Sequence, residues 1–206
     1  MGKIIANDVI VKSDGSISVE PNIGAALELT DDEMALAQEA MKAEVERIED
    51  KYTLVSPITA ENIECSVVTE AEALEVYKDF DEIIAFTEIK GGVGLSASQL
   101  GIGKQWFIAK MSTGRWEFYC NPKYYPHEKA HVSKREGCLT YPGKFREVKR
   151  YKSIIFMFDT LENGKLVNKR YIYRGLDSIV LQHESNHCGY PATIGKNIAI
   201  TIFKDI

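Results

Sequence analysis

The first clear periodic pattern in the chain predicts a helix near its N-terminus. Thr30 followed by Glu33 has the spacing of a capping box, in which each side chain hydrogen bonds to the backbone N–H of the other residue. Apolar residues then recur every three or four positions from Asp31 to Asp50, which is typical of an amphipathic helix. They form one stripe: Met34, Ala37, Met41, Val45 and Ile48.

Two further helices follow from the same signals. A second helix begins at Thr69, with Glu72 as its capping partner, and one face is expected to carry Leu74, Tyr77, Phe80 and Ile84. A last helix spans roughly Leu176 to His187, and Gly189 and Pro191 end it.

Strand-like runs lie between these helices, and turn signals separate them. A glycine-rich turn covers Gly91 to Gly94, and the pairs Asp14-Gly15 and Asn163-Gly164 predict hairpin turns. Helices and antiparallel strands are segregated rather than alternating, so the predicted fold class is α+β. The expected strands are Val9–Lys12, Ile17–Val19, Gln105–Met111, Trp116–Asn121, Ser153–Asp159 and Val167–Tyr173.

Composition limits the function classes. The 206 residues are 45% hydrophobic with a net charge of −5, which favours a soluble globular protein and argues against specific nucleic-acid binding. The chain offers no membrane-spanning run and a poor signal peptide, so a cytoplasmic protein with four reduced cysteines is expected. A local basic cluster is interpreted as the solvated face and ends of a strand; it comprises Lys144, Arg146, Lys149, Arg150 and Lys152.

The last helix contains the motif His183-Glu184-Ser185-Asn186-His187. Residues four apart lie on one helix face about one turn apart, so His183 and His187 can hold one metal ion. Glu184 would then act on a bound water molecule without being a ligand.

A third metal ligand is not found downstream of the motif. Thr193 stands where a histidine would be needed, and the acidic residue after His187 is Asp205, near the end of the chain. Any third ligand must therefore come from upstream. Cys188 is a poor candidate, because as the neighbour of His187 it would point about 100° away around the helix. Cys138 lies in an irregular Gly-Cys segment that favours a special role, and the upstream candidates are Cys120, His127, His131 and Cys138.

Three segments together resemble the peptide deformylase family. They are Gly92-Val93-Gly94-Leu95-Ser96-Ala97-Ser98-Gln99, Glu136-Gly137-Cys138-Leu139-Thr140 and Gln182-His183-Glu184-Ser185-Asn186-His187. The resemblance covers about Thr69 to Gly189 and implies antiparallel sheets packed around a central metal-binding helix. It leaves residues 1–68 as an extension of a catalytic domain, 69–206. The apolar stripe of the first helix favours packing of this extension on the catalytic domain over a separate partner-binding module.

The resemblance also implies roles for individual residues. Cys138, His183 and His187 match the metal ligands, and Glu184 matches the general acid/base. Gln99, through its side-chain amide, and Leu139, through its backbone N–H, match the donors to the oxyanion. The matching metal is Fe²⁺, with Zn²⁺, Ni²⁺ or Co²⁺ as substitutes, and the implied substrates are N-formylmethionyl peptides and nascent chains. The matching substrate-binding positions are Val93, Gly94, Gly137, Ile179 and Val180.

Departures from the family pattern leave alternatives open. Asn186 replaces an aspartate, so the positive group that balanced that acid is expected to lose a partner, and Cys188 alters the helix end. The tail after His187 is too short for the C-terminal helix implicated in ribosome contact, which would suit a viral or otherwise divergent enzyme. The other hypotheses are a different metallopeptidase and an inactive, deformylase-like binding protein.

Overall fold

The computed structural model describes residues 7–11, 17–21, 30–189 and 202–203, and the chain forms two compact units, Met1–Glu44 and Val45–Ile206. In the first unit, β1 (Asn7–Val11) and β2 (Ile17–Pro21) form an antiparallel hairpin, as the sequence predicted. The predicted Asp14-Gly15 turn lies outside the described residues.

Helix α1 (Asp31–Lys51) begins with the predicted capping box. The Thr30 N–H donates to Glu33 Oε2 at 2.8 Å, and the Glu33 N–H donates to Thr30 Oγ1 at 3.3 Å. The last turns of the helix belong to the second unit, where Ile48 is the buried member of the predicted stripe.

The predicted second helix is two helices in the structure, α3 (Glu70–Tyr77) and α4 (Phe80–Ile89). The Thr69–Glu72 capping box is present. The expected single face is wrong, because Leu74 and Tyr77 are exposed while Ala73, Ile83 and Phe86 are buried. The chain leaves helical geometry at Asp79, and the break lets each helix turn a different face to the core.

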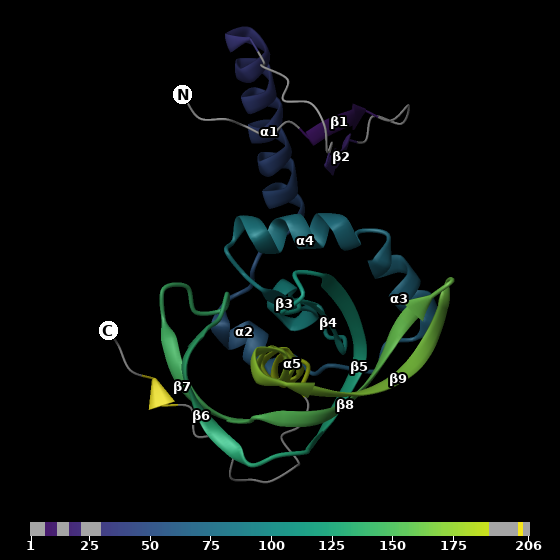
Figure 1. Cartoon of the computed structure of the whole chain (residues 1–206), viewed down its shortest axis with the longest axis vertical. Helices are drawn as coiled ribbons and strands as arrows, with labels where there is room; N and C mark the ends of the chain where they lie inside the picture. Colours follow the sequence, from purple (N-terminus) through teal and green to yellow (C-terminus); the bar gives the residue numbers. More distant parts are fainter. Residues whose placement is uncertain (1–6, 12–16, 22–29, 190–201, 204–206) are drawn as a thin grey trace. The chain divides into compact units, whose positions relative to one another are not determined.

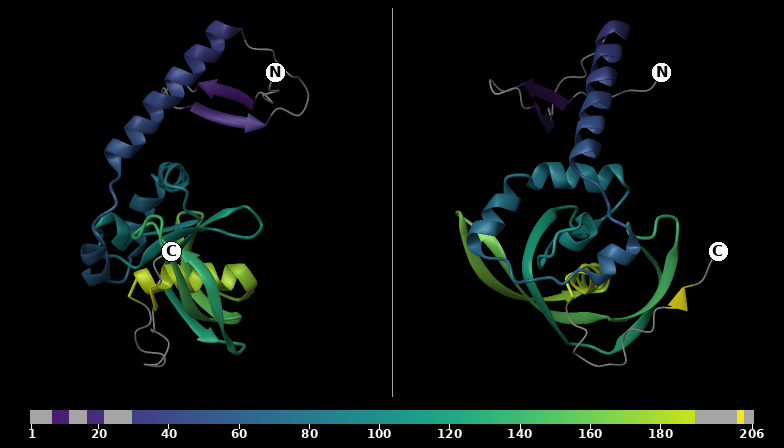
Figure 2. Two further views of the ribbon diagram at one scale, coloured as in Figure 1. Left: turned by 90° about the vertical axis from the view of Figure 1, so that its left-hand side faces the viewer. Right: turned by 180° about the vertical axis from the view of Figure 1, so that it is seen from behind.

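The second unit contains two antiparallel sheets and a central helix, α5 (Gly175–His187), as Figures 1 and 2 show. The five-stranded sheet has the order β3-β4-β5-β8-β9, and the three-stranded sheet has the order β10-β7-β6. The β8–β9 hairpin turns at Asn163 and Gly164, which both have the positive φ expected of this pair. The bounds are β3 Gly94–Ser96, β4 Trp106–Lys110, β5 Trp116–Pro126, β6 Ala130–Gly137, β7 Phe145–Tyr151, β8 Ser153–Glu162, β9 Lys165–Arg174 and β10 Ile202–Phe203.

Strand β6 was not predicted, and the strand inferred for the basic cluster is β7. Two short helical segments were also missed. Pro57 opens α2 (Pro57–Asn62) at its first turn, and η1 (Ala97–Leu100) is a 3₁₀ helix after β3. Proline suits a first helical turn because its missing N–H would have no helical partner there.

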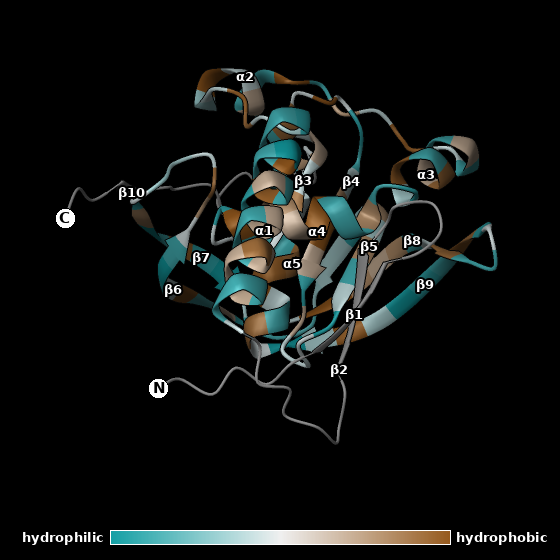
Figure 3. Cartoon of the chain, turned by 90° about the horizontal axis from the view of Figure 1, so that it is seen from above, coloured by the Kyte–Doolittle hydropathy of each residue, from teal (hydrophilic) through white to brown (hydrophobic). Residues whose placement is uncertain are grey.

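The hydrophobic core lies on both faces of the five-stranded sheet. Along β4, Trp106 and Ile108 pack in one cluster with Ile83 and Phe86 of α4. Phe107 packs in a second cluster, which contains Leu181 of α5. Figure 3 shows the hydrophobic positions of α4 and α5 in brown. Because both faces of β4 are buried, the strand has a nearly continuous run of apolar residues. In the described part of the chain, no helix has the length and apolar character to cross a bilayer.

Candidate active site

Helix α5 carries the His-Glu-x-x-His motif and is anchored by its own Gln182. The side chain of Gln182 accepts from the Tyr151 N–H at 2.9 Å and donates to the Tyr151 carbonyl at 2.9 Å. Ser178 also donates to that carbonyl, at 3.0 Å. These partly buried bonds fix the helix against the end of β7, which sets the position of the residue after Gln182, His183.

Cys138, directly after β6, meets the two histidines of α5. One ligand atom from each of Cys138, His183 and His187 lies within 4.8 Å of the others, and Cys138 Sγ is 3.2 Å from His187 Nε2. Burial opposes a charged thiolate, but hydrogen bonds from both histidines outweigh it and lower the pKa of Cys138 to about 4. The cluster therefore places a thiolate beside two histidine rings.

Glu136 and Arg150 hold His183 in place, and neither role was predicted. His183 Nδ1 lies 3.1 Å from Glu136 Oε2, which leaves Nε2 for the cluster. Arg150 binds Glu136 through Nε and Nη2, the latter at 2.7 Å, and both side chains are about 5% exposed. Burial opposes ionisation of Glu136, yet hydrogen bonds from His183 and Arg150 lower its pKa to about 2. Arg150 belongs to the basic cluster that was predicted to be solvated, and the prediction is wrong for this residue because its side chain is buried.

The prediction that Asn186 leaves a positive group without its partner is wrong. The positive group beside it is Arg150, which keeps a hydrogen bond from Nη1 to Asn186 Oδ1. An amide oxygen accepts that bond as an aspartate oxygen would, so the substitution removes a charge and preserves the contact.

Glu184 lies beside the cluster and is buried. Its Oε2 has no hydrogen-bond partner among the described residues, and burial raises the pKa of the carboxyl group. Gly94 of β3 allows this approach, because a Cβ atom there would lie 2.4 Å from Glu184 Oε1. A glycine is therefore required where β3 passes α5.

Gln99 presents its amide nitrogen to the cluster. Its Oε1 accepts from the Ser96 N–H at 2.9 Å, which fixes the orientation of the amide. Its Nε2 then donates to Thr140 Oγ1 at 3.0 Å and lies 3.7 Å from Cys138 Sγ. Leu139 comes next to this sulfur in the chain, and its side chain is so close to Gly92 that a Cβ there would lie 2.8 Å from Leu139 Cδ1.

The predicted substrate-binding residues differ in their exposure to solvent. Val93 is exposed, whereas Gly94 is buried against Glu184. Gly137 is exposed beside Phe145, whose Cε1 would lie 3.5 Å from a Cβ at that glycine. Ile179 is half-buried, and Val180 belongs to the core cluster against the sheet, so Ile179 is the more accessible of the two.

The other upstream ligand candidates lie outside the cluster. Cys120 is fully buried in the core, on the face of the five-stranded sheet opposite to α5. His127 and His131 line a separate surface hollow near the β5–β6 turn. Cys188 is buried and donates to the Trp106 carbonyl, in line with the prediction that it points away from the histidines. Within the described ranges, Cys138, His183 and His187 form the group suited to a metal ion.

The residues fit a metal ion with an open coordination position. One thiolate and two imidazoles are the donors that zinc and iron accept, and three protein ligands leave one place for water. The buried, unpartnered Oε2 of Glu184 would accept a hydrogen bond from that water. Fold and cluster together are those of an α+β hydrolase whose Cys-His-His group could hold a metal ion.

Comparison with known proteins agrees with this class. Residues 56–190 match the family model described as polypeptide deformylase. The chain is 29% identical over 131 residues to a peptide deformylase of Fusobacterium nucleatum, covering 62% of this chain and 74% of the relative. It therefore belongs to the peptide deformylase family.

Solved structures support the fold. The peptide deformylase of Thermotoga maritima is 26% identical with a TM-score of 0.57, covering 66% of this chain and 90% of that one. A probable peptide deformylase from Synechococcus phage S-SSM7 gives the same identity and TM-score, covering 66% and 93%.

Proposed function

We propose that this chain is a metal-dependent peptide deformylase that removes the N-formyl group from N-formylmethionyl peptides and nascent chains in the cytoplasm. One observation carries the proposal: a thiol and two imidazoles converge within 4.8 Å, next to a buried carboxylate that has no hydrogen-bond partner among the described residues. Cys138, His183 and His187 are the proposed ligands. Such a ligand set, flanked by a general base, suits hydrolysis of an amide.

A metal ion bound there would polarise the attacking water and the formyl oxygen. Glu184 would take the proton from that water at its carboxylate and later deliver it to the leaving amine. Its burial supports this role, because a raised pKa brings a carboxyl group closer to the operating pH. His183, held through Nδ1 by Glu136, needs no rearrangement to present Nε2.

Gln99 and Leu139 are the proposed donors to the oxyanion. The Gln99 amide is oriented before the reaction by the bond from Ser96 to its oxygen, so its N–H group is directed toward the cluster. A preorganised donor of this kind typically contributes about 3 kcal/mol to transition-state stabilisation. Val93, Gly94 and Gly137 would contact the peptide backbone, and Ile179 with Val180 would receive the methionine side chain.

The proposed native ion is Fe²⁺, with Zn²⁺, Ni²⁺ or Co²⁺ as substitutes. The preference for iron follows from family membership, since the donor set alone also suits zinc. The iron form is expected to lose activity in air, because oxygen oxidises the ion and then the thiolate.

Formate release from formyl-Met-Ala-Ser tests the activity. The full chain is purified without oxygen, loaded in turn with each ion, and its metal content is measured. Stoichiometric formate and free methionyl amine are expected, fastest with iron. Cleavage of an internal bond in an unformylated peptide would identify another metallopeptidase instead. Tight binding of the formyl peptide without formate would identify an inactive binding protein.

Matched variants test the ligand set. Cys138→Ser should reduce bound metal and turnover together. The double variant His127→Gln/His131→Gln removes the two rejected histidine candidates and should keep both. Metal loss in the double variant, with retention in Cys138→Ser, would overturn the assignment.

A further inference from the structure

The β6–β7 hairpin concentrates positive charge in an acidic protein. Between Lys129 and Lys152 the sequence contains eight Lys or Arg and two Glu, a formal charge of +6, whereas the whole chain carries −5. We call this segment, residues 129–152, the basic ribbon. One of its cations, Arg150, is buried with Glu136 and belongs to the site described above.

The exposed lysines of the ribbon differ from most other cations of the second unit. Elsewhere in this unit, most lysines and arginines pair with carboxylates, as in Lys51–Glu82 at 2.5 Å and Lys110–Glu88 at 2.9 Å. The ribbon lysines are exposed, and no carboxylate of the described ranges lies within ion-pair distance of them. These are Lys129, Lys134, Lys149 and Lys152. Charges left unneutralised in this way attract a polyanion over a distance of about 10 Å.

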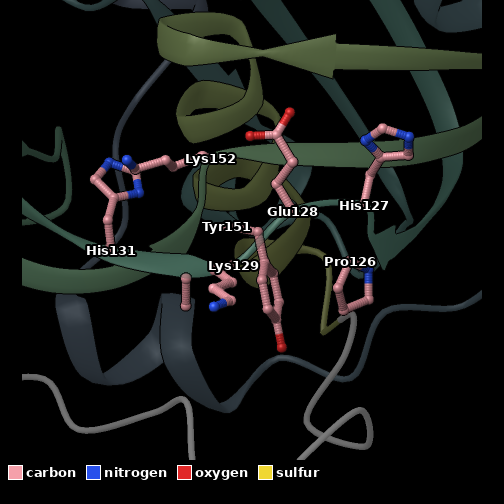
Figure 4. A pocket seen from close by; sticks show the side chains of 8 residues that line it. Pro126, His127, Glu128, Lys129, His131, Tyr151 and Lys152 are labelled. Carbon is pink, nitrogen blue, oxygen red and sulfur yellow. The ribbon is translucent and has the colours of Figure 1, made fainter.

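The open end of the ribbon contains a surface hollow. The Lys152 N–H donates to the Lys129 carbonyl at 3.3 Å, so the two ends of the segment meet there. The hollow has a volume of about 890 Å³ and combines cations with ring side chains, as Figure 4 shows. Its lining includes His127, Lys129, His131, Tyr151 and Lys152. Glu128, the acidic member, is engaged by Arg174 at 3.6 Å.

We propose that the basic ribbon and its hollow bind the phosphate backbone of RNA without sequence preference. Lysines contact phosphates, and histidine and tyrosine rings offer surfaces on which bases stack. The choice of RNA rests on the proposed function, because a nascent chain is presented at a surface rich in ribosomal RNA. The ribbon begins in the same strand that leads into Cys138, so binding there would hold the site near the emerging peptide.

The test measures binding of the metal-loaded full chain to a fluorescein-labelled mixed-sequence RNA of about 20 nucleotides, long enough for several phosphate contacts. The ribbon variant is Lys134→Glu/Lys149→Glu/Lys152→Glu. The control, Lys78→Glu/Arg115→Glu/Arg170→Glu, changes the net charge equally at exposed positions elsewhere. None of these residues belongs to the proposed catalytic site, so formyl-Met-Ala-Ser turnover should stay unchanged in both.

The ribbon variant should bind RNA about tenfold or more weakly, with a salt slope about three units smaller, because three phosphate contacts are lost. The control should keep most of the affinity. Equal loss in both variants would overturn the proposal, as would absence of RNA binding by the unmodified chain at low salt. Binding to phosphatidylserine vesicles in place of RNA would also overturn it. If the unmodified chain does not turn over the formyl peptide, the proposed function is contradicted instead.

Discussion

Gly94 provides the sharpest test of the catalytic geometry, because a single methyl group there would meet Glu184. In Gly94→Ala the new Cβ would lie 2.4 Å from Glu184 Oε1, 2.7 Å from Cδ and 3.0 Å from Cγ. All three distances are shorter than carbon and oxygen atoms tolerate without a shift. The carboxylate is buried, so it must move from its place beside the proposed metal ligands or push β3 away.

Both responses have a calculable size. Overpacking of one methyl group in a dense region costs about 1–3 kcal/mol. For a chain of this length, each kcal/mol lowers the melting temperature by roughly 2–4 °C. Displacing a general acid/base reduces turnover by about 10²–10⁴-fold. We therefore expect Gly94→Ala to lose at least about 100-fold in kcat while the protein remains folded.

Gly103→Ala is the matched control. Its Cβ would lie 2.7 Å from the Glu64 carbonyl oxygen, so it also introduces strain, but it does not touch Glu184. Both variants should melt at lower temperature, and both should retain metal by elemental analysis. Only Gly94→Ala should lose kcat on formyl-Met-Ala-Ser. Wild-type turnover by Gly94→Ala, or an equal kcat loss in the control, would refute the reasoning.

Three further outcomes follow from the site. Glu184→Gln should keep the metal and lose about 10²–10⁴-fold in kcat, and metal loss in this variant would contradict its role as a base. Arg150→Met should lower the free energy of unfolding by about 3–5 kcal/mol in a denaturant titration, because Glu136 would lose its buried partner; an unchanged value would exclude that pairing. Zinc affinity should rise about tenfold per pH unit between about pH 7.5 and 9, as measured by chelator competition. Burial opposes the charged form of His183, but hydrogen bonds to Cys138 and Glu136 raise its pKa to about 10, so the ring must release one proton to bind zinc in this window. Cys138, with a pKa lowered to about 4 by hydrogen bonds from the histidines, is already a thiolate. A zinc affinity that does not change with pH would contradict this.

Local signals predicted the parts of the fold that local chemistry determines. The capping boxes at Thr30 and Thr69 and the turn at Asn163-Gly164 all formed as expected, because each depends on residues a few positions apart. The break at Asp79 was missed, since no glycine or proline marks it and the packing of two helix faces decides it.

The site required information that spacing alone does not contain. The motif on α5 identified two histidines and a glutamate, but its spacing left four upstream candidates for the third ligand, and the family resemblance distinguished Cys138 among them. Arg150 was predicted to be part of a solvated cluster, because its partner Glu136 lies on another strand and their pairing is not visible in the sequence. Long-range pairing of this kind depends on the register of β6 and β7, and β6 had no alternating apolar pattern to reveal it.

The N-terminal extension allows one more prediction, with two truncations. The sequence predicts that residues 1–68 pack on the catalytic domain, because an amphipathic helix normally buries its apolar stripe. Within the second unit, Ile48 is 4% exposed and belongs to the core, and Glu49 pairs with Lys90 at 2.6 Å.

Deleting residues 1–50 should therefore destabilise the protein by about 2–5 kcal/mol, the usual effect of losing one large buried aliphatic side chain. Deleting only 1–44 keeps Ile48 and isolates the contribution of the first unit. A lower melting temperature for the shorter deletion, relative to the full chain, would support packing of the whole extension. If the 1–44 deletion leaves melting temperature, solubility and turnover unchanged, that unit is an independent appendage. If the 1–50 deletion is equally harmless, the stabilising role assigned to Ile48 is wrong as well.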